Sequence, residues 1–139
     1  MPGERVLIVD DNAMSLKLAA FVMNAHGYDV AVAVDATSAL EEIRWQRPDV
    51  VLMDIQMPGM DGLQLVRQLR ADVASQDLLI IAMTAYAMKG DDKRALAAGC
   101  DGYITKPIDT RALASTVASA LREAVLRQGK GRLPSKPDV

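Results

Sequence analysis

Short apolar runs alternate with helix-like segments along this chain, and the alternation repeats five times. Runs such as Val6–Val9 and Val50–Met53 are apolar at every position, which is typical of strands in a sheet that helices cover on both faces. Successive strands joined by short β–α–β crossovers become parallel, because these crossovers are right-handed. The pattern therefore predicts an α/β fold: a single doubly wound domain whose five-stranded parallel sheet has five helices on its two sides.

The bounds of the expected elements follow from the apolar runs and from residues that start or end helices. Strands are expected near Arg5–Val9, Asp29–Ala33, Asp49–Met53, Leu78–Met83 and Gly102–Thr105. Helices are expected near Ala13–Ala25, Ala36–Gln46, Leu63–Asp72, Lys89–Ala98 and Thr110–Arg127. Gly27 and Gly99 follow two of these helices and are expected to be C-terminal caps. Asp35 and Asp109 are expected to be N-caps.

Length and composition limit the class of protein. The chain has 139 residues, half of them hydrophobic, which is enough for one domain with a real core. A net charge of -2 and an aromatic content of 4% speak against a nucleic-acid surface. The single cysteine, Cys100, excludes an internal disulfide and fits a reducing compartment.

The two ends of the chain give expectations about location and domain bounds. The run Val6–Val9 is too short for a signal peptide, and the apolar stretch Leu78–Met88 is too short to cross a membrane. A cytoplasmic protein with no membrane partner is therefore expected. The domain is expected to occupy residues 1–127. Residues 128–139 contain glycines, prolines and dispersed basic residues, so they are expected to form a disordered tail.

Polar or reactive side chains stand at the ends of four of the five expected strands: Asp10 and Asp11, Asp54, Thr84, and Lys106. Strand ends of a parallel sheet share one edge, and open α/β sheets bind their ligands there. Clustered carboxylates repel one another unless a cation intervenes, and Mg²⁺ prefers such hard oxygen ligands together with phosphate oxygens. A lysine and a threonine can hold the oxygens of a phosphoryl group. The set predicts attack by an aspartate on phosphorus, giving an aspartyl phosphate.

Four stretches that carry these side chains resemble the receiver domains of two-component response regulators, the CheY-like superfamily. The matching stretches are Val6–Asn12, Leu52–Gly62, Met83–Ala87 and Gly102–Pro107. Order, spacing and residue types agree over about Val6 to Val125. The segment Ala87–Asp91 is most similar to stand-alone receivers of the DivK type. The resemblance implies a flavodoxin-like fold with strand order 2-1-3-4-5 and a cis peptide bond before Pro107.

The resemblance also implies which residues bind metal and phosphoryl. Asp54 is the expected phosphoacceptor. Asp11 and Asp54 are expected to bind Mg²⁺ (or Mn²⁺) directly, together with the backbone carbonyl of Gln56, and Asp10 through a water on the metal. Lys106 is expected to pair with the phosphoryl oxygens.

Further roles concern switching and the lifetime of the phosphorylated state. Thr84 is expected to move toward the phosphoryl group, and Tyr103 to rotate inward as it does. Gln56 and Tyr86 occupy the two positions that tune dephosphorylation. A sensor histidine kinase or a histidine phosphotransfer protein is the expected phosphodonor, and a downstream protein is the expected target. The chain is expected to be a monomer or a phosphorylation-dependent dimer, and not a turnover enzyme.

Other functions remain as alternatives to a single-domain response regulator. The chain could be a receiver cut from a hybrid histidine kinase. A small aspartate-nucleophile phosphatase would use a similar pocket, but it needs an acid two positions after its nucleophile, where this chain has Gln56. A nucleotide-binding protein would need a glycine-rich phosphate loop, and neither common form of that motif is present. Asp54 alone, before proline and glycine, could also be a simple turn former.

Overall fold

The sheet and its helices alternate along the chain as the apolar runs predict. The structure is a computed structural model that describes residues 3–57, 60–84 and 91–127. The large sheet contains β1 (Arg5–Val9), β2 (Asp29–Ala33), β3 (Val50–Asp54), β6 (Leu79–Thr84) and β7 (Gly102–Thr105). The helices are α1 (Ala13–Ala25), α2 (Ala36–Trp45), α3 (Gly62–Ala71), α4 (Asp91–Ala98) and α5 (Thr110–Arg127). A small antiparallel pair, β4 (Gln56–Met57) and β5 (Met60–Asp61), lies between β3 and α3.

The five strands of the large sheet are parallel and lie in the order β2-β1-β3-β6-β7. Counted without the small pair, this is the order 2-1-3-4-5 that the family resemblance implied. The chain proceeds from β1 outward to β2 on one side, and from β3 through β6 to β7 on the other. The order therefore reverses between β1 and β3, and a crevice at the carboxyl ends of these two strands is where such sheets bind ligands.

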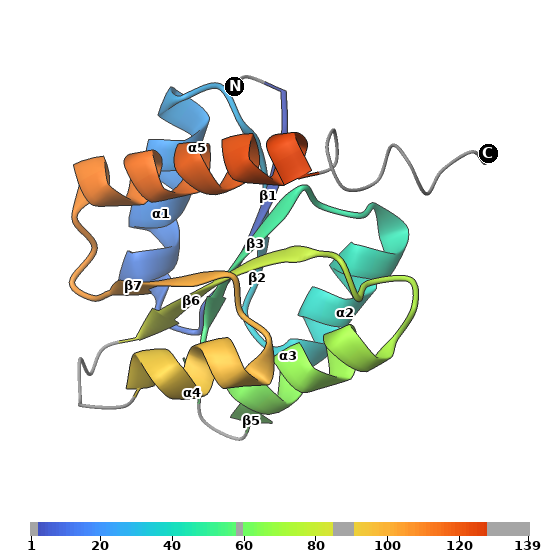
Figure 1. Cartoon of the computed structure of the whole chain (residues 1–139). Coiled ribbons are helices and arrows are strands. Elements are labelled where there is room, and N and C mark those ends of the chain that lie inside the picture. The colour runs from blue at the N-terminus through green and yellow to red at the C-terminus, as the bar shows by residue number, and fades with distance from the viewer. Residues whose placement is uncertain (1–2, 58–59, 85–90, 128–139) are drawn as a thin grey trace.

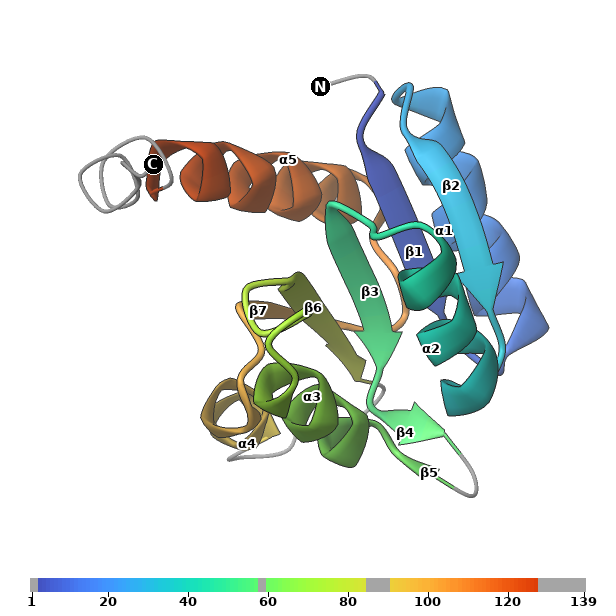
Figure 2. The same ribbon diagram turned by 90° about the vertical axis from the view of Figure 1, so that its right-hand side faces the viewer.

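The sheet lies between two layers of helices (Figure 1; Figure 2). Alternate residues of β1 point to opposite faces: Val6 and Ile8 pack in the cluster with α1 and α5, and Leu7 and Val9 pack in the cluster with α2, α3 and α4. All five residues of β1 are buried, as are all five of β3. This two-sided burial explains why the strands are apolar at every position instead of alternating with polar residues.

Helix ends carry the capping residues that the sequence predicted. Gly27 and Gly99 have φ values of 88° and 117°, in the left-handed region that glycine enters without a Cβ clash. Asp35 accepts a hydrogen bond from Ser38 N–H at 2.8 Å at the start of α2. Asp109 accepts one from Arg111 N–H at 3.0 Å at the start of α5. These four predicted caps are confirmed.

Several predicted bounds differ from the structure by one residue. β3 and β6 each begin and end one residue later than predicted, so Asp54 and Thr84 belong to the strands themselves. Asp54 is paired with Met83, and Ile55 N–H donates to the Met83 carbonyl at 3.0 Å, which extends the ladder past the apolar run. α2 ends one residue earlier than predicted, and α3 lies one residue earlier at both ends.

One element was missed by the sequence analysis, and two predictions fall outside the described residues. The pair β4–β5 was not predicted, because two-residue strands have no periodicity to detect; Figure 2 shows it beyond the end of β3, beside α3. The predicted start of the fourth helix at Lys89 and the predicted tail at 128–139 lie outside the described residues. Among the described helices, none is both long and apolar enough to cross a membrane.

Candidate functional site

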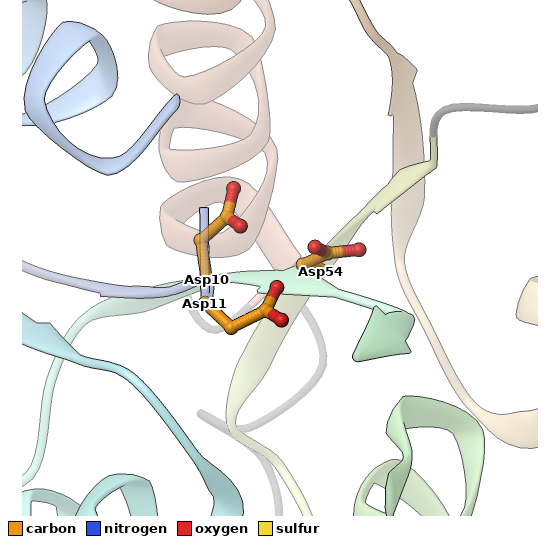
Figure 3. Close-up of side chains that lie close together, drawn as sticks. All are labelled: Asp10, Asp11 and Asp54. Carbon is orange, nitrogen blue, oxygen red and sulfur yellow. The ribbon is translucent and has the colours of Figure 1, made fainter. Parts of the chain in front are cut away.

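Three carboxylates meet at the ends of β1 and β3 (Figure 3). Asp10, Asp11 and Asp54 each offer an oxygen, and these oxygens all lie within 4.8 Å of one another. Asp10 is completely buried and Asp54 is 4% exposed, whereas Asp11 is exposed. The cluster therefore reaches from the interior of the sheet edge to the surface, and a ligand can approach it from the side of Asp11.

Backbone amides and one ammonium group hold the two buried carboxylates. Asn12 N–H donates to Asp10 Oδ1 at 2.9 Å, and Gln56 N–H donates to Asp54 Oδ1 at 2.9 Å. The remaining oxygen of each carboxylate faces Lys106, whose Nζ lies 2.8 Å from Asp10 Oδ2 and 3.2 Å from Asp54 Oδ2. Each buried carboxylate thus has one oxygen fixed by the backbone and one beside the same cation.

The local backbone places Lys106 at the end of β7, from where its side chain reaches the carboxylates. Lys106 follows β7, and its N–H donates to the Thr84 carbonyl at 2.7 Å, which continues the pairing of β6 with β7 beyond its end. The peptide bond between Lys106 and Pro107 is cis, as the family resemblance implied. The Lys106 side chain is only 14% exposed, so its ammonium group lies in the crevice and not in open solvent.

The charges of the site are visible in two shifted pKa values. Burial raises the pKa of Asp10 and the negative charge of Asp54 adds to this, although the close contact with the Lys106 ammonium group and the hydrogen bond from Asn12 N–H oppose it. Burial alone would lower the pKa of Lys106, but its close contact with Asp10 and the charges of both carboxylates outweigh burial and raise the pKa. The ammonium group of Lys106 can balance only one of the three carboxylates, so the cluster keeps an excess of negative charge.

The donor set fits a small divalent cation. Asp10 Oδ2 is buried and receives no well-aligned hydrogen bond within the described part of the chain, although Lys106 Nζ is in ionic contact with it. The cluster offers only hard oxygen atoms, the ligand type that Mg²⁺ and Mn²⁺ take with carboxylates and water. A bound cation would balance the excess charge, so the residues present fit the predicted magnesium site.

The structure places the other predicted site residues around this cluster. Thr84 ends β6 with 2% of its surface exposed, and Tyr103 lies on the neighbouring β7 with 43% exposed. Gln56 follows Asp54 by two residues as the first residue of β4. Tyr86 lies outside the described residues. Asp10, Asp11, Asp54 and Lys106 are thus brought together as predicted, and Thr84 reaches the same edge of the sheet.

A comparison with known proteins identifies the family to which this fold belongs. The family model of the response regulator receiver domain matches residues 6–118. The chain belongs to this family. The receiver is 40% identical over 119 residues to the polar-differentiation response regulator DivK of Brucella anthropi, a match that covers 86% of this chain and 97% of DivK. The predicted family and the similarity to DivK are confirmed.

Solved structures agree with this assignment. A CheY-like receiver domain protein of Methanospirillum hungatei superposes on this receiver with a TM-score of 0.82 and 30% identity, covering 90% of this chain and 98% of that one. The receiver domain of a sensor histidine kinase of Pseudomonas aeruginosa gives a TM-score of 0.78 and 31% identity, covering 86% and 98%. In that structure, a magnesium ion is coordinated in the active-site cleft.

Two residues of this receiver that shape the site were not assigned a role from the sequence. Asn12 is the N-cap of α1 as well as the donor to Asp10. Asparagine directly before an expected helix is a capping signal, and it would have identified the first of these functions. Gly62 begins α3 so close to β3 that an added Cβ would lie 2.5 Å from Ile55 Cα and 2.8 Å from the Asp54 carbonyl oxygen. No pattern in the sequence gives that distance.

Proposed function

We propose that this receiver accepts a phosphoryl group on Asp54 in a reaction that depends on Mg²⁺ or Mn²⁺. The observation that supports this most strongly is the position of the Asp54 carboxylate, in contact with Lys106 and within a few ångströms of Asp10 and Asp11. The donor is a phosphohistidine, carried by a sensor histidine kinase or by a histidine phosphotransfer protein. The receiver that is similar to this chain in Pseudomonas aeruginosa belongs to a sensor histidine kinase, so the same chemistry applies if this chain is part of a hybrid kinase.

The transfer uses the residues at the sheet edge in distinct roles. An oxygen of Asp54 attacks phosphorus, an O–P bond forms, and the P–N bond to the donor imidazole breaks with its electron pair on that nitrogen. The ammonium group of Lys106 pairs with the phosphoryl oxygens, and the Thr84 hydroxyl donates a hydrogen bond to one of them. A bound cation would be held by Asp10, Asp11, Asp54 and the backbone carbonyl of Gln56, and it would supply positive charge that stabilises the transfer.

The proposal includes a change of surface after phosphorylation. Thr84 moves toward the phosphoryl group, and Tyr103, which is partly exposed on the adjacent strand, turns inward. These movements alter the face formed by α4, β7 and α5, where a downstream protein binds in a state-dependent way. Gln56 and Tyr86 set the rate at which the aspartyl phosphate is lost.

The receiver is proposed to be a cytoplasmic signalling module and not a turnover enzyme. Gln56 occupies the position where a small aspartate-nucleophile phosphatase needs a general acid, and an amide cannot fill that role. No direct contact with nucleic acid is proposed, because the net charge is only -2. The receiver acts as a monomer or as a dimer that forms on phosphorylation.

Phosphorylation of the intact chain tests the proposal directly. The protein is incubated with acetyl phosphate and Mg²⁺, and intact-mass spectrometry is expected to find one added phosphoryl group. Asp54→Asn is expected to remove the addition completely, because an amide is not a nucleophile toward phosphorus. The exposed Asp77→Asn serves as the matched control and is expected to phosphorylate normally. Addition that survives Asp54→Asn, or no addition to the parent protein, would contradict the proposal.

The phosphodonor is proposed to dock on α1, which begins directly after Asp11 and Asn12. Its solvent side carries Met14, Leu18 and Phe21, which are 79%, 38% and 72% exposed. These positions are spaced by four and three residues, so they form one apolar ridge along the helix. Exposed apolar patches mark protein interaction sites, and this one lies on the helix that begins directly after the acidic pair Asp10 and Asp11.

Truncation of the ridge is expected to separate docking from chemistry. Phe21→Ala should slow phosphotransfer from a phosphorylated histidine phosphotransfer protein by at least about tenfold, since buried aromatic anchors dominate interface energies. Phosphorylation by acetyl phosphate should be unchanged, because this small donor needs no docking surface. Val125→Ala, which truncates an exposed apolar side chain on α5, is the control. Equal loss with both donors, or no loss with either, would count against docking on α1.

A further inference from the structure

Asn12 lies between the first helix and the metal cluster, and its side chain and its backbone N–H bind in opposite directions. Its side-chain Oδ1 accepts the Ser15 N–H at 3.0 Å, which caps α1. Its own backbone N–H donates to Asp10 Oδ1 at 2.9 Å. The residue has an extended backbone, with φ -87° and ψ 114°. The side chain thus binds forward into the helix while the amide binds backward to a buried carboxylate.

We propose that Asn12 is a positioning residue for the metal site: by capping α1, its side chain fixes the backbone amide that aims Asp10 at the cation. This inference deepens the proposed function and rests on its magnesium site. Within the described part of the chain, the side chain of Asn12 makes no hydrogen bond to a carboxylate, so its effect on the metal is transmitted through its own backbone.

A cap fixes the backbone of its residue because its side-chain bond closes only in one local conformation. Without the bond from Ser15 N–H, residue 12 is tied to α1 only by the Leu16 N–H bond to its backbone carbonyl at 2.9 Å. The first turn then frays more readily, and the φ and ψ angles of residue 12 are set less tightly. The amide of residue 12 then loses its fixed direction toward Asp10 Oδ1. A buried carboxylate that changes rotamer when its donor moves binds a cation less tightly, since metal ligands must be held in place before the ion arrives.

A continuous set of contacts carries this effect to the phosphoacceptor. Ser15 N–H binds Asn12, Asn12 N–H binds Asp10, and the other oxygen of Asp10 lies 2.8 Å from Lys106 Nζ. Lys106 Nζ lies 3.2 Å from Asp54 Oδ2. The first turn of α1 is therefore joined to Asp54 through groups in direct contact, and the cap is the one link in this set that a side-chain substitution removes without deleting a charge.

Three neutral substitutions in the full chain test the inference. Asn12→Ala removes the cap, whereas Asn12→Ser keeps it, because serine caps about as well as asparagine. Ser38→Ala is the matched control: it removes the Ser38 Oγ bond to the Asp35 carboxylate at the start of α2, and Ser38 has no bond to the metal carboxylates. Titration calorimetry with Mg²⁺ gives the dissociation constant, and hydrogen exchange in metal-free protein gives the protection of the residue-12 amide.

Asn12→Ala is expected to weaken Mg²⁺ binding about fivefold, the factor that the typical free energy of one cap gives if all of it is linked to the metal-bound state. The residue-12 amide is expected to exchange faster in the same variant without metal. Asn12→Ser should restore both values, and Ser38→Ala should leave both unchanged although it also lowers the unfolding temperature. Saturating Mg²⁺ should return the phosphorylation rate of Asn12→Ala to that of the parent protein.

Distinct results overturn the inference and the proposed function. Parental Mg²⁺ affinity in Asn12→Ala, or a loss in Asn12→Ser equal to that in Asn12→Ala, would show that the cap does not position Asp10. Equal weakening in Ser38→Ala would reduce the effect to general destabilisation. A parent protein that binds no Mg²⁺, or that is phosphorylated elsewhere than at Asp54, would instead remove the proposed function itself.

Discussion

Replacement of Lys106 with methionine is expected to lower the free energy of unfolding of the metal-free protein by about 3 kcal/mol at neutral pH. Methionine keeps a similar length but removes the ammonium group that lies 2.8 Å from Asp10 and 3.2 Å from Asp54. Asp10 is completely buried and Asp54 nearly so, so both carboxylates would be left without a cation and would repel each other. Urea denaturation in the presence of a chelator measures the loss.

The pH dependence of this loss follows from Asp10. Its pKa is already raised in the folded protein, chiefly by burial, and removal of Lys106 raises it further. The unfolded carboxyl keeps its ordinary pKa of about 3.9, so in the acid range the folded state binds more protons than the unfolded state. The free energy of unfolding of the variant should therefore increase as the pH falls from neutral toward the unfolded pKa of about 3.9. In the opposite direction, this added stability is lost as the pH rises through the folded pKa of Asp10. The gap to the parent protein should narrow in acid.

Magnesium should narrow the same gap at neutral pH, because a cation between the carboxylates takes over the electrostatic part of the role of Lys106. The exposed Lys93→Met is the control for removing one positive charge and is expected to change stability by less than about 0.5 kcal/mol. If Lys106→Met and Lys93→Met lose equal stability, or if the loss is the same at every pH, the contacts of Lys106 do not stabilise the fold.

Most of the fold could be predicted because its three central strands, β1, β3 and β6, are buried on both faces. A strand such as β1, with every residue buried, must be apolar throughout, and a short continuous run between turns is visible in one sequence. Polar residues explain why the predicted β3 and β6 ended one residue too early. Asp54 and Thr84 pair within the ladder although their side chains are polar, and hydropathy alone cannot distinguish such a position from the start of a loop. The pair β4–β5 was missed because each strand has two residues.

For the candidate site, too, the sequence predicted which residues take part, but not which atoms are in contact. The sequence indicated which side chains stand at the strand ends, and the shared edge of a parallel sheet indicated that they meet. It could not indicate that one ammonium group contacts both Asp10 and Asp54, because this depends on the path of the Lys106 side chain across the crevice. Nor could the sequence indicate that the Asn12 backbone N–H donates to Asp10, because every residue except proline has such a group.

Gly62 matters because backbone atoms lie too close to it for a side chain to fit. Gly62→Ala is therefore expected to lower the free energy of unfolding by about 3 kcal/mol. An added Cβ would lie 2.5 Å from Ile55 Cα and 2.8 Å from the Asp54 carbonyl oxygen, which are backbone atoms and not flexible side-chain ends. Gly62 N–H also donates to the Ile55 carbonyl at 3.3 Å, so α3 and β3 cannot simply move apart without losing that bond. The backbone that carries the phosphoacceptor must shift instead.

Gly102→Ala provides a matched control, because an added Cβ there meets no atom within 4 Å. Both substitutions reduce the freedom of the unfolded chain equally, so the difference between them reports the folded state alone. Alanine is also the better helix former by about 1 kcal/mol, which would favour Gly62→Ala if sterics were absent.

Urea denaturation should rank Gly62→Ala well below Gly102→Ala. Phosphorylation by acetyl phosphate should fall in Gly62→Ala even under conditions where it remains folded, since Asp54 is displaced. Equal stability of the two variants would mean that the start of α3 yields without moving β3, and Asp54 would then owe its position to Lys106 and the Gln56 amide rather than to the packing of α3.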